Sequence, residues 1–455
     1  MTHLSAPLAV VEVRDLHGRS YRVGERPHDI IGRSRRWMLG LSWAAMAGIG
    51  VLQYGYGVAV AALHATAALH ATDGASVTRA LWVLALWVVF QAGAAAPTAA
   101  LTHRFALAPS RAVLVGALLC AAGPLTLAYT DSVALAVLGY SVLCGTGAGI
   151  VYATCTSTVA KWYPEQRAVR VGFVTGAFGF GAVPFIALFA TVLSPGNRAE
   201  IFAGVGVCVL IVVAVCGALL RDPPAGWWPA EIDPKLWAVD KRVNRSLRNN
   251  APAVRQYSPG EAVRTPAFVV MYLILVFAAA ASLLAIVYVP FVAISHGFSL
   301  AIGASAVGLL AVVNGAGRSV AGRISDRFGR RQTLSAALLL EGCAQLGLVY
   351  SASEGQPAAF VIFAALTGLA GGAFYPLFAS LVADYFGERN AVRNFGVVYS
   401  AKLFGGIVGV GLPALVVASR GLAVVFVVAG LLSLCAAILT RQLHRPGYLV
   451  LHLPR

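Results

Sequence analysis

Residues 317–331 read GRSVAGRISDRFGRR and join two long apolar segments, residues 303–322 and 332–350. Each segment is long enough to cross the hydrocarbon core of a membrane as an α-helix. A tight turn between two such helices needs glycines for close backbone approach, an acid to cap or bridge a neighbouring helix end, and cations at the lipid headgroups. The stretch therefore predicts a membrane hairpin, whose loop residues are Gly322, Asp326, Arg327, Gly329 and Arg330.

The rest of the chain has the same apolar character. Of its 455 residues 59% are hydrophobic and 11% are charged, and the mean hydropathy is +0.78, which is more apolar surface than a soluble core can hide. Apolar runs of about 20 residues recur, too long for the strands of a membrane barrel. We predict an all-α membrane protein with twelve spans, near residues 37–63, 78–101, 112–130, 133–159, 169–193, 201–220, 266–291, 303–322, 332–350, 358–382, 395–417 and 421–439.

A long polar segment, residues 221–265, separates six predicted spans from six. The sequence LTHRF at 101–105 lies in the first set where ISDRF at 324–328 lies in the second, which indicates two related halves. The predicted organisation is an N-terminal tail, a first half, a basic linker, a second half and a C-terminal tail, at residues 1–36, 37–220, 221–265, 266–439 and 440–455.

Loop 317–331 resembles, at this position between two spans, the loop motif of the major facilitator superfamily. The resemblance implies two pseudo-symmetric six-helix halves around a central cavity, which spans eight and eleven help to line. In the first half His103 stands where the motif has its acid, so we expect no acid-dependent gate latch on that side.

The basic residues are distributed asymmetrically. Of the 34 Lys and Arg residues, 29 fall on the tails and on the loops after even-numbered spans, whereas the opposite side has only Arg79, Arg198 and Arg420. By the positive-inside rule, both termini and the linker are cytoplasmic in a multi-pass protein of the cell membrane. The first 36 residues have seven arginines and no apolar core, so the first span is its own insertion signal. The net charge of +16 therefore reflects topology, and we expect no nucleic-acid partner.

The sequence also argues against several kinds of chemistry. The seven cysteines all fall inside predicted spans, without a CxxC pair, and are interpreted as small buried hydrophobic residues. No nucleophile motif, metal-ligand cluster or phosphate loop has a plausible context. We therefore expect no metal, no cofactor and no enzyme activity.

Ionisable residues within spans are costly in lipid, so each is a candidate site residue. Two cations meet this description, Arg318 in span eight and Lys402 in span eleven. A guanidinium fork can hold one carboxylate while an ammonium attracts a second, so this pair predicts an anion site. The alternative is that either cation extends to the lipid headgroups. Glu341 is the one acid well inside a span, and we interpret it as a packing contact in span nine, which leaves no carboxylate for a proton relay in the cavity.

Several aromatic and polar residues accompany small residues in the same spans. Phenol hydroxyls can orient carboxylate oxygens while the rings exclude water, although any single tyrosine is more often a packing residue. The candidate substrate-binding residues are Arg318, Lys402, Gln53, Tyr54, Tyr152, Phe178 and Tyr375.

Over residues 37–439 the chain resembles the oxalate/formate antiporter family, with the monocarboxylate transporters as more distant relatives. The resemblance implies that Arg318 and Lys402 bind carboxylate and that Tyr54, Tyr152 and Tyr375 are aromatic site positions. Phe178 lacks the hydroxyl often found there, and Gly371 lacks the bulky aromatic ring of oxalate carriers, so we expect a looser pocket that prefers an anion other than oxalate. The passages that carry the resemblance are VAKWYPEQR at 159–167, GAFGFG at 176–181, PGEAVRTPAF at 259–268, NGAGR at 314–318 and YSAK at 399–402.

The leading hypothesis is thus a monomeric secondary carrier that moves small mono- or dicarboxylates, such as oxalate or formate, by alternating access. Exchange or uniport fits the missing cavity acids better than proton symport. A proton-coupled monocarboxylate carrier, a proton-driven cation or drug exporter, and a non-transporting sensor on the same fold are the alternatives.

Overall fold

Twelve helical spans dominate the protein, whose structure, a computed structural model, describes residues 10–15, 20–67 and 74–447. The twelve-span prediction is confirmed, with ends that differ by a few residues. The first half contains α2 (Arg35–Gly48), α3 (Val51–Tyr54), α4 (Tyr56–Ala67), α5 (Gly74–Gly93), α6 (Ala95–Phe105), α7 (Pro109–Tyr129), α8 (Val133–Ala136), α9 (Gly145–Trp162), α10 (Arg167–Phe180), α11 (Val183–Thr191) and α12 (Arg198–Leu219). The second half contains α15 (Pro266–Ser295), α16 (Leu300–Phe328), α17 (Arg330–Ser353), α18 (Pro357–Phe386), α19 (Ala391–Tyr399), α20 (Ala401–Gly406) and α21 (Leu412–Leu439).

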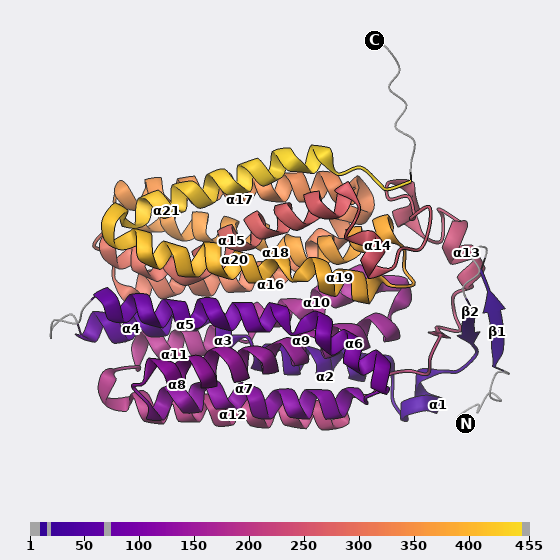
Figure 1. The fold of residues 1–455 in the computed structure, drawn as a ribbon, viewed down its shortest axis with the longest axis horizontal. Helices are drawn as coiled ribbons and strands as arrows, with labels where there is room; N and C mark the ends of the chain where they lie inside the picture. The colour runs from indigo at the N-terminus through magenta and orange to yellow at the C-terminus, as the bar shows by residue number, and fades with distance from the viewer. Residues whose placement is uncertain (1–9, 16–19, 68–73, 448–455) are drawn as a thin grey trace, which may run out of the picture.

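The two sets of helices form two bundles that lie side by side, the first indigo to magenta and the second orange to yellow in Figure 1. Some spans consist of more than one helix. The first span is α2, α3 and α4, and its short middle helix lies between Gly50 and Gly55. A Cβ at Gly50 would lie 2.1 Å from the Phe178 carbonyl oxygen, so the glycine lets the first span approach the fifth closely.

Glycines also form the contact between the bundles at α10 and α16. A Cβ at Gly176 would lie 2.4 Å from the Gly315 carbonyl oxygen, and a Cβ at Gly315 would lie 2.6 Å from that of Gly176. One turn away, a Cβ at Gly179 would meet the Ala311 carbonyl at 2.2 Å. Toward the other end of the crossing the separation is wider, because a Cβ at Gly322 would lie 3.6 Å from the Ala168 carbonyl. The backbones are therefore closest in the middle of the molecule and diverge toward one end.

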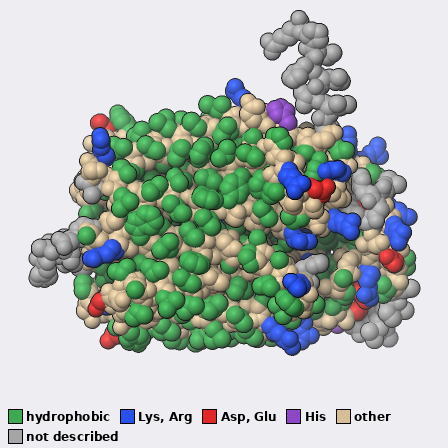
Figure 2. All heavy atoms as spheres, viewed as in Figure 1, with side chains coloured by type: hydrophobic (Ala, Val, Ile, Leu, Met, Phe, Trp, Pro, Cys, Tyr) green, Lys and Arg blue, Asp and Glu red, His purple; other side chains and the backbone are tan. Residues whose placement is uncertain are grey.

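That end carries the linker and the N-terminal segment, and we call it the linker end. Strands β1 (Val11–Arg14) and β2 (Ser20–Val23) pair antiparallel, and β2 pairs in parallel with β3 (Trp227–Trp228) of the linker. The sheet was not predicted from the sequence. Lys and Arg side chains gather at this end, on the right of Figure 2, beside the broad hydrophobic surface of the spans. The short helices here are α1 (Pro27–Ile31), α13 (Pro234–Val239) and α14 (Pro259–Ala262).

The linker is folded rather than extended. In α14, Ser258 and Glu261 form a reciprocal capping box, and the hydrogen bonds from Ser258 to the carboxylate hold the pKa of Glu261 below its ordinary value. The last strand packs on the first half, where the rings of Trp162 and Trp227 lie 5.2 Å apart. The linker thus joins the bundle through specific contacts.

The cysteines depart from expectation in one respect. Cys120, Cys144, Cys155 and Cys216 are buried, whereas Cys208, Cys343 and Cys435 are exposed. The three exposed thiols lie on spans six, nine and twelve, so they correct the prediction that all seven are buried. A membrane-facing surface accepts such weakly polar side chains as readily as a core does.

Candidate functional site

Arg318 is buried at the contact between the halves and makes its polar contacts there. Its side chain is 3% exposed on α16. The guanidinium donates from Nη2 to Asn314 Oδ1 at 3.3 Å and to the Tyr54 hydroxyl at 3.5 Å, and from Nε to Asn314 Oδ1 at 3.4 Å. The Tyr54 hydroxyl donates to the same Asn314 oxygen at 2.9 Å. Because the side chain is buried and its contact with Tyr54 crosses to the first half, Arg318 does not extend to a headgroup region in this structure.

Lys402 lies on α20 in an equally buried position, 3% exposed. Its ammonium group donates to Gln53 Oε1 at 2.9 Å and to Gln91 Oε1 at 2.8 Å, and both acceptors belong to the first half. The amide nitrogen of Gln91 in turn donates to the Tyr399 hydroxyl at 3.2 Å. Lys402 thus bridges the two halves through neutral oxygens.

Aromatic rings surround the two cations. The Tyr375 ring has Arg318 Cζ 5.4 Å and Lys402 Nζ 5.7 Å from its centroid, so both cations adjoin one ring. Lys402 Nζ is also 6.0 Å from the ring of Phe178. Tyr152 stacks on Tyr399 with ring centroids 5.1 Å apart. Tyr54 and Tyr152 each meet Phe178 edge-on, at 6.1 and 6.3 Å. These distances suit cation–π attraction and aromatic packing.

The structure therefore brings all seven predicted candidates together: Arg318, Lys402, Gln53, Tyr54, Tyr152, Phe178 and Tyr375. Within the part of the chain that the structure describes, no carboxylate lies within 4.0 Å of either cation. Removing an ion from water costs several kcal/mol even after relaxation, and neutral oxygens offset this only in part. Two buried cations without a counter-charge make a site that favours an anion.

Sequence reasoning missed three residues of this site. Gln91 and Asn314 are the neutral acceptors on the two cations, and Tyr399 contacts both Gln91 and Tyr152. Gln91 is an amide in the apolar run VVFQAG, and a polar side chain within a span is a signal that could have found it. Asn314 and Tyr399 stand in the quoted passages NGAGR and YSAK but were not assigned a role.

The space beside Gly371 is filled. A Cβ at this position would lie 2.4 Å from the Ser282 hydroxyl oxygen and 3.4 Å from the Asn314 amide nitrogen. The glycine therefore permits close packing of α18 against α15 and Asn314. The expectation of a looser pocket at Gly371 is wrong because Ser282 occupies the room that the missing side chain leaves.

Glu341 has a neutral partner in the second half. Its Oε2 accepts a hydrogen bond from the Ser433 hydroxyl at 3.0 Å, and both residues are buried. That hydroxyl also lies 2.8 Å from the Leu338 carbonyl oxygen. The contact joins α17 to α21, which agrees with the interpretation of Glu341 as a packing residue.

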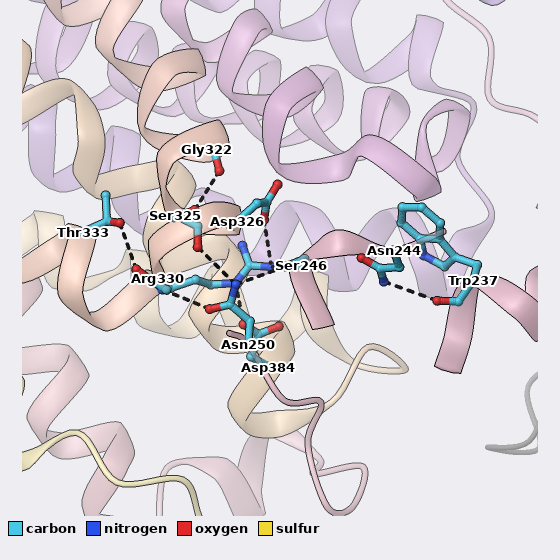
Figure 3. A network of polar contacts seen from close by, with 11 residues as sticks. Trp237, Asn244, Ser246, Asn250, Gly322, Ser325, Asp326, Arg330, Thr333 and Asp384 are labelled. Carbon is cyan, nitrogen blue, oxygen red and sulfur yellow. Dashed lines mark hydrogen bonds and ion pairs between the residues drawn. The ribbon is translucent and has the colours of Figure 1, made fainter. Parts of the chain in front are cut away.

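The loop motif forms its own polar cluster at the linker end. Gly329 has φ +94°, a backbone conformation that favours glycine, and it separates α16 from α17. Arg330, the first residue of α17, pairs with Asp384 of α18 and, at 3.7 Å, with Asp326. Figure 3 shows two linker residues at Arg330: Ser246 accepts from its guanidinium, and Asn250 accepts from its backbone N–H. Arg327 instead covers the ring of Phe328, 5.4 Å from its centroid, and Gly322 faces the first half.

A cavity of about 490 Å³ separates the halves at the linker end, and we call it the vestibule. Its walls include Thr156 and Pro376, which are close in sequence to the site residues Tyr152 and Tyr375, and Phe395, whose ring lies 5.6 Å from that of Tyr399. Tyr399 in turn stacks on Tyr152, so wall residues of the vestibule adjoin rings of the site. The vestibule therefore leads toward the candidate site from one end.

Comparison with known proteins gives a consistent family. The family model described as Major Facilitator Superfamily matches residues 38–353 and 305–448. The oxalate:formate antiporter of Oxalobacter formigenes is 27% identical over 343 residues, covering 74% of this chain and 77% of that protein. Monocarboxylate transporter 11 of Mus musculus is 24% identical, covering 72% and 70%. A structure of the xylose transporter XylE from E. coli, in a partially occluded inward open conformation, matches with TM-score 0.63 at 14% identity and covers 90% of this chain and 99% of that one.

Proposed function

Because the chain belongs to the major facilitator superfamily, we propose that it is a secondary transporter whose substrate is a small organic anion, a mono- or dicarboxylate such as oxalate or formate. The observation that carries the proposal is the buried pair Arg318 and Lys402, which has neutral partners and no carboxylate among the described residues. The named antiporter and monocarboxylate transporter among the relatives support the same substrate class.

The roles of the site residues follow from their chemistry. The Arg318 fork can hold one carboxylate with two parallel hydrogen bonds, and the Lys402 ammonium can neutralise a second carboxylate or the far side of a single one. The Tyr54 hydroxyl, already near Arg318, can donate to a substrate oxygen. The rings of Phe178 and Tyr375 exclude water and so strengthen each of these interactions.

The site's position between the halves supports alternating access. Arg318 and Lys402 belong to the second half, whereas Tyr54, Gln53 and Gln91 belong to the first. A substrate that replaces some of these contacts changes the attraction between the halves, and rocking about the α10–α16 contact would expose the site at either end. We assign the linker end to the cytoplasm, since 29 of 34 basic residues are expected there.

The experiment is counterflow in proteoliposomes of the purified protein. Vesicles preloaded with unlabelled oxalate, formate or another carboxylate should accumulate the labelled anion transiently, whereas empty vesicles and vesicles loaded with xylose should not. A panel of mono- and dicarboxylates would identify the substrate. Absence of counterflow and of net uptake for every carboxylate, by protein that is folded and inserted, would contradict the proposal.

A further inference from the structure

The linker between the halves has an anchor on each of them. On the first half, Lys161 pairs with Asp222, and Trp162 Nε1 donates to the Arg221 carbonyl at 2.8 Å. The β2–β3 pairing then holds Trp227 and Trp228 against the N-terminal segment. Helix α13 extends this anchor, because it packs on β1 and its Trp237 ring lies 6.4 Å from the ring of Trp228.

The second anchor is Asn250, which is 4% exposed and binds both helices of the loop hairpin. Its amide nitrogen donates to the Ser325 carbonyl near the end of α16 at 3.1 Å, and its amide oxygen accepts from the Arg330 backbone N–H at the start of α17 at 3.0 Å. The Arg330 N–H is a group that the start of a helix leaves without a partner, so Asn250 caps α17, whereas the Ser325 carbonyl also accepts from the Gly329 N–H at 3.0 Å. Asn249 adds a bond to the Arg327 carbonyl at 2.6 Å.

Between the anchors the linker passes over the vestibule. Trp237, Val243 and Leu247 form part of its wall, opposite residues of both halves. The Ser246 hydroxyl accepts from Arg330 Nη2 at 3.3 Å, so the segment also contacts the ion pairs of the loop motif, as Figure 3 shows. Opening of the linker end must separate the two anchored halves, and this segment lies across the gap that would widen.

We propose that residues 246–250 are a latch that limits the opening of the linker end and must release its bonds to the hairpin before the vestibule opens fully. The released bonds are those of Asn249, Asn250 and Ser246. We expect the loss of two such bonds to shift the ratio of latched to open molecules by about tenfold, which is about 1.4 kcal/mol in total and about 0.7 kcal/mol for each bond. The latch therefore sets how often the vestibule opens rather than what the site binds.

The test measures access to the vestibule with a cysteine at Ala379, a wall residue of α18, in a variant without the seven native cysteines. Labelling by a membrane-impermeant maleimide is followed in purified protein in nanodiscs. We expect Asn250→Ala to speed labelling about five- to tenfold and Asn249→Ala about two- to threefold. The matched control is Asn244→Ala, because the Asn244 amide donates to Trp237 within the linker and should leave the rate unchanged.

The melting temperature of each variant checks that it folds. Asn249→Ala is a second check on folding, because Asn249 is exposed and its replacement disturbs no buried side chain. Unchanged labelling in both Asn249→Ala and Asn250→Ala would overturn the latch, and so would an equal rise in Asn244→Ala. The latch depends on the proposed function only in so far as opening of the vestibule serves transport. The assay contains no substrate, so a failure of the latch and a failure of carboxylate transport are read separately.

Discussion

At the scale of single residues, the proposed function rests on two buried cations. Arg318 and Lys402 are both 3% exposed, and each contacts neutral oxygens instead of an acid. A substrate carboxylate would be the first counter-charge at either position. Losing one partner of such a desolvated pair commonly costs about 2–5 kcal/mol, a factor of roughly 30 to several thousand in affinity.

We therefore expect Lys402→Ala and Arg318→Ala to abolish transport while leaving membrane abundance and melting temperature nearly unchanged. Arg318→Lys should not restore binding, because an ammonium cannot reproduce the two-pronged contact with Asn314 and substrate. Substrate affinity and membrane abundance, measured side by side, check this. Normal affinity in Lys402→Ala would eliminate the two-cation site.

A substitution at Glu341 can distinguish exchange from proton-coupled transport. Its carboxyl group is buried and bonded to Ser433, on a contact between α17 and α21. If it only packs, Glu341→Gln should preserve counterflow within about twofold, since the amide keeps an acceptor for the Ser433 hydroxyl. The measurement is counterflow together with uptake driven by an imposed pH gradient. Gradient-driven accumulation that disappears in Glu341→Gln would favour the proton-coupled alternative.

At the scale of the helices, glycine contacts at α10 and α16 set how closely the halves approach. Gly176 and Gly315 have backbone oxygens of the partner helix where a Cβ would lie, at 2.4 and 2.6 Å. Backbone cannot move aside as a side-chain end can, so one methyl group must separate the helices. Overpacking of this kind typically costs about 1–3 kcal/mol.

Gly176→Ala and Gly315→Ala should each lower the melting temperature and reduce counterflow severalfold. Gly308→Ala on the same α16 is the control, because nothing lies within 4 Å of the Cβ that it adds. That variant should match the wild type or be slightly more stable, given the helix propensity of alanine. Thermal melts in detergent and counterflow on all three variants provide the comparison, and equal behaviour would show that the crossing tolerates a side chain.

Some features of the helices could be predicted from the sequence, and others could not. The spans were predictable because their apolar length is dictated by the bilayer, and Arg318 and Lys402 because charge within a span is rare. Asn314 and Tyr399 were not predicted because neutral polar and aromatic residues are common in membrane helices, and their partners Tyr54 and Gln91 lie on distant spans. The β2–β3 pairing was missed because it joins short segments about 200 residues apart. The contact of Ser282 with Gly371 was missed because the two residues lie on different spans.

At the scale of the whole molecule, orientation in the membrane follows from charge. The linker end gathers basic side chains, as Figure 2 shows, and the opposite end has few. A reporter fused at Arg245 should therefore indicate the cytoplasm, and one at Glu354, between α17 and α18, the exterior. Alkaline phosphatase and fluorescent-protein fusions give opposite signals at the two positions. An exterior signal at Arg245 would reverse the assignment of the linker.

Because the linker is anchored on each half, the chain can be divided between the two anchors. Each half retains its own tethered piece when the chain is divided between Asp240 and Lys241: Trp227 stays with Trp162, and Asn250 stays with Ser325. Co-expressed fragments 1–240 and 241–455 should therefore find each other in the bilayer, co-purify, and exchange substrate, with a vestibule that labels faster than in the intact chain. The intact linker would then affect how often the vestibule opens more than how the two halves assemble. The gene could be split or permuted at this point, and its product would still assemble.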